Sequence, residues 1–241
     1  MTETVRELAA RKSVRVFENT PVTEEERTAI LQSACEAPTA GNQQMYTIIE
    51  IRDEALKKTM ADLCDHQPFI ASAPLVLVFC ADWRKWYDLF ALAGAGPRKP
   101  EVGDLLLAVS DTCIAAQNAV TAAQSLGIGS CYIGDVMENC EQMRQTLSLP
   151  EYVFPCAMLV FGRPTLQQKE RPKPPRHAIE DIVCLDRYEV KNKDGLYSMF
   201  SVKSAGKPVE EWARAFCARK YDSAFSREMS RSVREYLKDF E

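Results

Sequence analysis

The chain has 241 residues, of which 46% are hydrophobic and 27% charged, with a net charge of −4 and a pI of about 5.5. This length is enough for one large or two small domains with a substantial buried core. The weakly acidic charge gives no electrostatic reason to bind nucleic acid or an anionic membrane surface, so neither is expected as a partner.

Cysteine and histidine usage indicates a reducing compartment and no metal site. The nine cysteines are scattered singly, with no CxxC pair, and most lie in apolar runs where a thiol packs as a small hydrophobe. Only two histidines are present, so no zinc site is expected. The N-terminus is mixed and charged, and no apolar run approaches the roughly 18–20 residues of a membrane helix. We therefore expect a cytoplasmic protein.

A short basic stretch, Arg11-Lys12-Ser13-Val14-Arg15, follows an apolar-periodic run near the N-terminus that is typical of a helix end. Two arginines with a serine between them can bind one phosphate from two sides, while the hydroxyl takes a third oxygen. Taken alone, the stretch fits a solvated charged loop better, because short basic runs are common.

The next segments predict a helix, a loop and a strand. Thr23-Glu24-Glu25-Glu26 is a capping-box pattern, so a helix is expected over residues 23–36, ending at Ala37-Pro38. The small polar residues 39–44 predict a loop that can bring backbone and amide groups close to a planar ligand. Residues 46–51 are rich in β-formers and predict a strand.

A second helix is expected from Asp53, with apolar residues at helical spacing. The connecting segment 66–69 leads to the continuous apolar run 75–81, which suits a buried strand. The aromatic and basic residues 83–87 are typical of a pocket rim or a dimer contact, and the Gly- and Pro-rich segment 94–100 predicts a linker.

Residues 105–126 are apolar on nearly every side and contain no Gly or Pro, which predicts a helix at the centre of the protein or of a dimer interface. Gly127 would end it. A short strand is expected at 130–133, a helix at about 138–147 and a strand at 156–161.

The C-terminal third begins with an extended cationic segment, 167–176, which contains three prolines and could be a solvated linker. Two helices are expected beyond it, at about 209–219 and 225–240. A C-terminal arm of this kind can dock across a partner subunit or pack on its own chain.

The motifs of several enzyme classes are absent. The chain has no GxGxxG after a strand, no GxxxxGK[ST] and no GxSxG, and its two histidines leave little for an acid–base triad. The remaining candidates are cations, a small polar loop, the amide of Gln67 and a Gly-containing turn at 132–135. No side chain is therefore expected to act as the catalytic reagent, a pattern that fits a cofactor performing the chemistry.

Several short motifs occur together in a specific order. They are the basic stretch 11–15, Ala-Pro-Thr-Ala-Gly-Asn-Gln-Gln at 37–44, Ala-Ala-Gln-Asn-Ala at 115–119, Ser-Leu-Gly-Ile-Gly at 125–129 and Tyr-Ile-Gly at 132–134. This ordered set resembles the nitroreductase family, closest to its larger FMN-dependent nitroreductases and flavin reductases, over roughly residues 5–176.

The resemblance implies an α+β fold, a three-layer α/β/α sandwich with a mostly antiparallel sheet, in a homodimer that binds FMN at the subunit interface. Residues 1–176 would form the FMN-binding core, and residues 177–241 an extended C-terminal arm that packs across the dimer. The long helix at 105–126 would then be the dimer core.

The resemblance also implies which residues bind FMN. The basic stretch would contact the phosphate and one edge of the ring. A Lys-x-Arg pair of the family would contact the phosphate and the pyrimidine side of the ring, and it stands here in swapped order as Arg171 and Lys173. Thr39-Ala40 replaces the more usual Ser-Ser, and the 38–42 loop would come from the other subunit. The expected cofactor-binding residues are Arg11, Lys12, Ser13, Arg15, Pro38, Thr39, Ala40, Asn42, Gln67, Tyr132, Ile133, Gly134, Asp135, Lys169, Arg171 and Lys173.

The implied reaction is ping-pong hydride transfer from NADPH or NADH through flavin N5 to a nitroaromatic, quinone or flavin acceptor. One alternative is another reaction on the same fold, reductive dehalogenation or flavin breakdown, for which segment 83–100 would supply a lid. A second alternative is a non-catalytic flavin-binding or redox-sensing protein. The choice between the two nicotinamides is left open, with Arg219, Lys220 and Arg227 as possible 2′-phosphate contacts or a solvated helix face.

Overall fold

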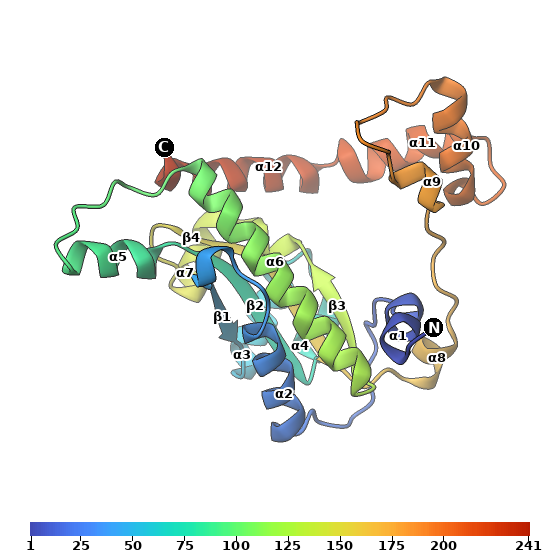
Figure 1. The fold of residues 1–241 in the computed structure, drawn as a ribbon. Helices are drawn as coiled ribbons and strands as arrows, with labels where there is room; N and C mark the ends of the chain where they lie inside the picture. Colours follow the sequence, from blue (N-terminus) through green and yellow to red (C-terminus); the bar gives the residue numbers. More distant parts are fainter. The chain divides into compact units, whose positions relative to one another are not determined.

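The computed structural model describes residues 1–241 and contains one four-stranded antiparallel sheet, at the centre of the first of its two compact units (Figure 1). The strand order is β1-β2-β4-β3, and the two central strands consist entirely of buried residues. A continuous apolar run suits such a position because both faces of the strand are covered. The strands are β1 (Tyr46–Glu50), β2 (Leu75–Asp82), β3 (Gly129–Ile133) and β4 (Val153–Gly162).

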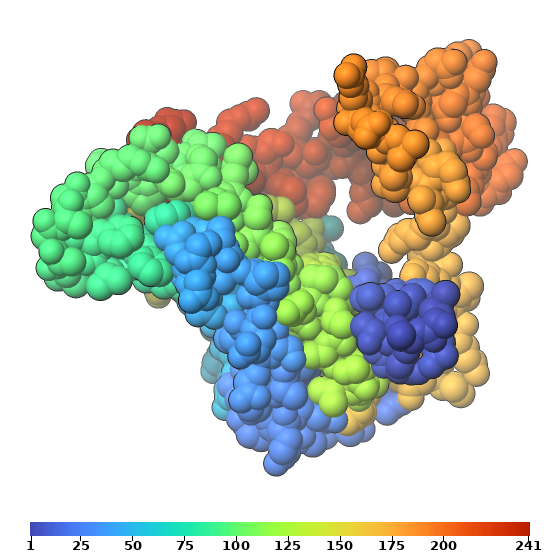
Figure 2. All heavy atoms as spheres, in the orientation of Figure 1, coloured from blue at the N-terminus to red at the C-terminus, as the bar shows by residue number.

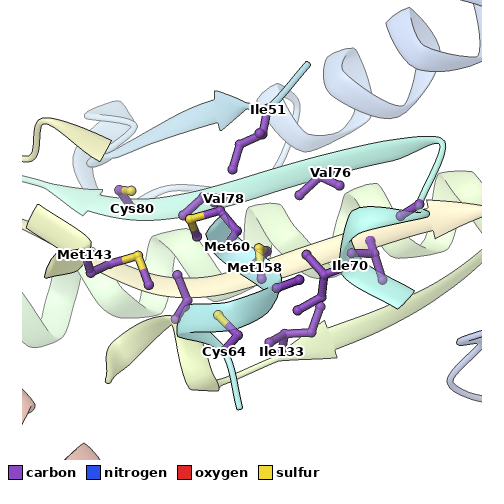
Figure 3. Packing of buried hydrophobic residues seen from close by; sticks show 14 of the residues in the cluster. Ile51, Met60, Cys64, Ile70, Val76, Val78, Cys80, Ile133, Met143 and Met158 are labelled. Atoms are coloured by element: carbon purple, nitrogen blue, oxygen red, sulfur yellow. The ribbon is translucent and has the colours of Figure 1, made fainter. Parts of the chain in front are cut away.

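Helices cover both faces of the sheet, which confirms the predicted three-layer α+β sandwich. On one face, α2 (Glu24–Cys35) and α6 (Val102–Ser125) bury apolar side chains against Phe79 and Phe161. On the other face, α3 (Glu54–Leu63), α4 (Pro68–Ala71) and α7 (Cys140–Leu147) cover the cluster drawn in Figure 3, where Met60 lies beside Val78.

Local sequence signals determine where these helices begin and end. Both hydrogen bonds of the predicted Thr23–Glu26 capping box are present, and the Asp53 carboxylate accepts the Leu56 N–H at 2.7 Å. Gly127 follows α6 with φ of 71°, a left-handed conformation that favours glycine. The predicted starts of α2 and α3 and the predicted end of α6 are confirmed, whereas α6 begins at Val102, three residues earlier than predicted, and includes Gly103.

Helix α6 is buried on one side only. Ala115, Ala116 and Ala119 are fully buried against the sheet, whereas Leu106, Leu107 and Ile114 are more than 40% exposed. The prediction of a helix at the protein centre therefore holds for one face of α6. By length and composition α6 is also apolar enough to span a membrane, which the sequence expectation had missed, and 44% of its most apolar window is buried in the protein.

The remaining short helices of the first unit lie in the segments that connect its strands and longer helices. Figure 2 shows α1 lying against the C-terminal half of α6 on this face of the molecule. These helices are α1 (Glu3–Ala10), η1 (Ala40–Asn42), α5 (Arg84–Leu92), η2 (Asp135–Met137) and α8 (Leu166–Glu170).

The chain forms two compact units. The first comprises residues 1–171 and 228–241, and the second comprises residues 172–227. The chain leaves the first unit after residue 171 and returns to it at residue 228. The second unit contains α9 (Ile179–Ile182), α10 (Lys193–Ser204), α11 (Val209–Phe216) and a π-helix (Cys217–Tyr221).

The last helix is α12 (Ala224–Leu237), followed by the short η4 (Lys238–Phe240). From residue 228 onward they contact α7 and β4 of the same chain. Tyr236 and Phe240 are buried, and the Tyr236 ring contacts Phe154 edge-on at 5.1 Å between centroids. Asp239 forms an ion pair with Arg144. Residues 228–241 thus contact the body of their own chain.

Candidate functional site

The basic stretch leaves α1 and runs beside the edge strand β3. The Val14 N–H donates to the Ser130 carbonyl at 2.9 Å, and Ser13 forms a parallel bridge with Ser130. This close approach requires glycine at position 129, because a Cβ there would lie 2.5 Å from Val14 Cγ2. The side chains of Ser13 and Arg15 are therefore fixed along the strand that leads to Tyr132.

Two arginines of the stretch lie over aromatic rings. The Arg11 guanidinium is 6.0 Å from the centroid of Tyr132, and that of Arg15 is 5.8 Å from the centroid of Phe69. Neither arginine has a carboxylate within ion-pair distance, although 11 other arginine–carboxylate pairs occur in the protein. Arg11 Nε is buried and has no hydrogen-bond partner. Both cations can therefore meet an anion from outside the chain.

The second cationic segment lies beside the first. The Lys12 ammonium donates to the carbonyl of Lys169 at 2.7 Å and to that of Arg171, while the Arg171 guanidinium donates to the Ser13 carbonyl at 2.6 Å. Arg171 Nε is also buried without a partner. Lys169 forms an ion pair with Glu18 at 3.0 Å. The structure thus brings residues 11–15 together with Lys169 and Arg171, and these residues form a cationic cluster. Lys173 belongs to the second unit.

The predicted amide and the Gly-containing turn also meet. Gln67 Nε2 donates to Asp135 Oδ2 and to the Cys64 carbonyl, both at 2.8 Å. Both N–H groups of this amide are therefore used inside the protein, and its oxygen is the group that remains for a ligand donor. Ile133 is buried at the end of β3, whereas Gly134 is exposed as the chain enters η2.

The 38–44 loop is held by a residue that sequence reasoning missed, Asp111 on α6. Its buried carboxylate accepts the Thr39 hydroxyl, the Ala40 N–H at 3.0 Å and the Met45 N–H at 3.4 Å. A signal was present, because Asp111 is the one acid between residues 105 and 126. Thr39 is the residue that the carboxylate positions directly, and Asn42 has a positive φ of 56° at the turn.

The loop and the cationic cluster lie at different levels of α6. Lys12 lines a cavity of about 400 Å³ together with Gln124, while the loop is bound at Asp111. At 1.5 Å per residue, these two positions are roughly 20 Å apart along the helix. This separation applies to Lys12. Arg11 is nearer to the loop, because the Tyr132 hydroxyl beside it reaches Gln117 at 3.4 Å, about 9 Å along α6 from Asp111.

Burial shapes the electrostatics around the cluster. Burial raises the pKa of Tyr132 to about 12 in spite of Arg11, so the phenol stays neutral and can donate a hydrogen bond. Burial likewise raises the pKa of the Cys131 thiol, against the influence of Arg15 and Ser13. The pKa of Glu138 is raised to about 7 by burial and by the neighbouring Asp135, Asp65 and Glu228. The cations and neutral donors next to β3 are thus groups that can bind an anion.

In the second unit, the cations of the C-terminal segment have partners of their own. Arg227 forms an ion pair with Asp222, and the Arg219 guanidinium lies 5.4 Å from the centroid of Phe216. Lys220 lies 5.9 Å from the centroid of Phe225.

Comparison with known proteins gives consistent matches over most of the chain. The model described as Nitroreductase family matches residues 8–163. An FMN reductase [NAD(P)H] of Bacillus subtilis is 30% identical over 90% of this chain and 91% of its own length. An oxygen-insensitive NADPH nitroreductase of Salmonella typhimurium is 35% identical over 74% of this chain and 73% of its own. The solved structure of B. megaterium NfrA2 has a TM-score of 0.83 at 28% identity, covering 99% of this chain and 97% of its own.

Proposed function

The chain belongs to the nitroreductase family, and from that premise we propose that it is an FMN-dependent oxidoreductase. It takes hydride from NADPH or NADH and transfers it to nitroaromatic, quinone or flavin acceptors. The relatives are named as FMN reductases and NADPH nitroreductases, and this agreement supports an enzyme over a flavin-binding sensor. None of the named relatives is a dehalogenase or a flavin-destroying enzyme.

The observation that carries the proposal is the cationic cluster with its unmatched donors. Arg11 Nε and Arg171 Nε are buried without acceptors inside the protein, next to Ser13 and Arg15. A buried N–H without an acceptor is costly, and a phosphate of about −1.5 to −2 charge offers several oxygens to such donors. The residues therefore fit the ribityl phosphate of FMN.

Each part of the cluster has a proposed task. Arg11, Ser13 and Arg15 bind the phosphate, and Arg171 with Lys169 binds the phosphate and the pyrimidine side of the ring. Lys169-Glu170-Arg171 has the spacing of a Lys-x-Arg pair, and the contacts of residues 169 and 171 with Lys12 favour this register over Arg171 and Lys173. Lys173 remains a candidate for FMN binding because it is the lysine of the swapped Arg171–Lys173 pair.

The ring side of the site is formed by neutral groups. Gln67 offers its amide oxygen to a ring or ribityl donor, and the backbone from Tyr132 through Ile133 and Gly134 to Asp135 offers N–H groups to the ring. Bound FMN supplies the hydride-accepting and hydride-donating chemistry, and it needs no acidic or basic side chain for that. The task of these residues is to orient the ring and to leave one of its faces accessible.

We further propose a homodimer in which the partner completes each site. The exposed Leu106, Leu107 and Ile114 give α6 an apolar face that a second copy would cover. Asp111 holds the loop roughly 20 Å along α6 from the Lys12 end of its own cluster, which supports the donation of Pro38, Thr39, Ala40 and Asn42 to the other subunit. All nine cysteines are free, in keeping with the cytoplasm as the proposed location.

The test is an absorbance spectrum of the purified protein, followed by anaerobic addition of NADPH and, separately, NADH. Flavin bands that bleach support bound FMN and hydride transfer, and the faster donor identifies the preferred nicotinamide. A protein that binds FMN but is bleached by neither donor contradicts the enzymatic proposal. A protein that takes up no FMN contradicts the site itself.

A further inference from the structure

Lys12 differs from the other cations of the cluster because its ammonium binds backbone carbonyls. It donates to the carbonyl of Lys169 at 2.7 Å and to that of Arg171. An ammonium has three N–H groups, so at least two are used inside the protein. The ammonium thus connects the end of α1 with the end of α8, 157 and 159 residues later.

The connection is reciprocal. While Lys12 donates to the Arg171 carbonyl, the Arg171 guanidinium donates to the carbonyl of Ser13, the residue next to Lys12. The buried side chain of Gln168 adds a weaker link, since its Oε1 accepts the Arg15 N–H at 3.4 Å. In each cationic segment, one side chain therefore donates to a backbone carbonyl of the other segment. Arg171 Nε and the side chains of Ser13 and Arg15 remain for a ligand.

Arg171 needs such support because of its place in the chain. It is the C-cap residue of the five-residue helix α8 and the point at which the chain leaves the first unit, directly before Pro172. Helix α8 is too short to hold its own end, since isolated helices of this length are unstable in water. Apart from the Lys12 contact, the backbone of Arg171 is held by one hydrogen bond, from its N–H to the Gln167 carbonyl at 3.0 Å.

We propose that Lys12 is a positioning residue for flavin binding, which acts through Arg171 and not on the phosphate. By holding the Arg171 carbonyl, it keeps the guanidinium in its binding position before the ligand arrives. Preorganisation of this kind raises affinity because less side-chain and backbone freedom is lost on binding. The proposal rests on the proposed function, since the ligand whose affinity changes is FMN.

A double-mutant cycle on FMN affinity tests the proposal. The dissociation constant of FMN is measured by flavin fluorescence with the apoprotein of the full chain, for Lys12→Met, Arg171→Met and the double variant. Met keeps the length of the lysine stem and removes its donors. We expect Lys12→Met to weaken FMN binding about tenfold in the wild-type background, and less than about twofold when Arg171 is already Met.

Three further measurements distinguish positioning from other roles. Lys12→Arg restores donors for both carbonyls and should bind FMN within about threefold of the wild type. Lys58→Met removes an exposed lysine of α3 and gives the same change in net charge, so it should leave the affinity unchanged. The unfolding midpoint of the apoprotein shows whether Lys12→Met acts by general destabilisation, in which case Arg171→Met would not suppress its effect.

The outcomes separate the two proposals. If the losses of the Lys12 and Arg171 variants multiply in the double variant, Lys12 contacts the ligand independently and the positioning role is wrong. If Lys12→Met binds FMN as tightly as the wild type, the role is also wrong, whereas the proposed function stands. If the wild type itself binds no FMN, the proposed function fails first.

Discussion

Replacing Glu138 by Gln should stabilise the protein in alkaline solution and leave its stability unchanged in acid. Only 6% of Glu138 is exposed, and its Oε1 is buried without a hydrogen-bond partner. The groups that face it are the carboxylates of Asp135, Asp65 and Glu228. Glu228 remains ionised because Arg231 and the Ser232 hydroxyl hold its pKa at about 2. The folded protein therefore resists ionisation of Glu138.

The magnitude follows from the pKa. Burial and the neighbouring acids raise the pKa of Glu138 from 4.5 to about 7, so the folded state binds more protons than the unfolded state between these values. Stability then falls as pH rises through this interval, by about 3 kcal/mol in total, and the loss is complete above pH 7. Gln cannot ionise, and its amide can donate to the neighbouring carboxylates. We expect the Glu138→Gln variant to exceed the wild type by roughly 4–10 °C in Tm at pH 8 and by almost nothing at pH 4.5.

The assay is thermal unfolding from pH 4.5 to pH 8.5 at one ionic strength, with apoprotein and again with a fixed excess of FMN. Glu141→Gln is a matched control on the neighbouring helix, because Arg231 lowers the pKa of Glu141 to about 2. That variant should lose a little stability at neutral pH, which is the opposite sign. A difference between Glu138→Gln and wild type that does not change with pH, or a loss at pH 8, would refute the reasoning.

Three other substitutions test the packing and the charges of the site. Gly129→Ala places a Cβ 2.5 Å from Val14 Cγ2, so it should destabilise the protein by about 1–3 kcal/mol in urea unfolding, and Val14→Ala should restore part of that loss. Asp111→Ala leaves the Thr39 hydroxyl and two backbone N–H groups without their acceptor and should cost about 3 kcal/mol in the same assay, with Asp111→Asn costing less. Arg15→Ala removes a cation without a carboxylate partner and should raise the dissociation constant of FMN at least about tenfold, whereas Arg6→Ala, at an exposed Arg6–Glu3 pair, should not change it.

Local patterns were sufficient to predict most of the core. Thr23 and Asp53 cap their helices through side chains within three residues, so the signal for each start lies in one short segment. The run 75–81 is apolar throughout because β2 is covered on both faces. These predictions depend only on neighbours in sequence or on burial.

Helix α5 was missed because its stabilisation is not local. Its N-cap residue, Trp83, makes no side-chain capping bond, and none of its residues is fully buried. The Trp83 and Trp86 indoles donate instead to carbonyls of distant segments, those of Asp104 at 2.6 Å and Gln43 at 2.9 Å. A pattern of aromatic and basic residues gives no indication of such partners.

The candidate site was predictable in its residue types but not in its internal contacts. The cations at 11–15 and 169–171 could be read from the sequence, whereas the partners of Lys12 are carbonyls, which every residue possesses. The role of Asp111 could have been inferred from one acid in an apolar helix. The 39–45 loop that Asp111 binds could not be inferred from the sequence, because the hydrogen bonds between them span 66 to 72 residues.

The arrangement of the cationic stretch follows from the small residues of the sheet beneath it. Gly129 of β3 and Gly162 of β4 are paired in register, and a Cβ on either would collide with the N-terminal segment, with Val14 and with Phe17 respectively. Val14 is 4% exposed, so it faces the sheet, and in an extended chain its neighbours Ser13 and Arg15 point the other way. The apolar side chains thus hold the segment against two glycines, and this contact, which needs no ligand, sets the direction of the polar ones. The anion site is therefore expected to keep its geometry in the apoprotein.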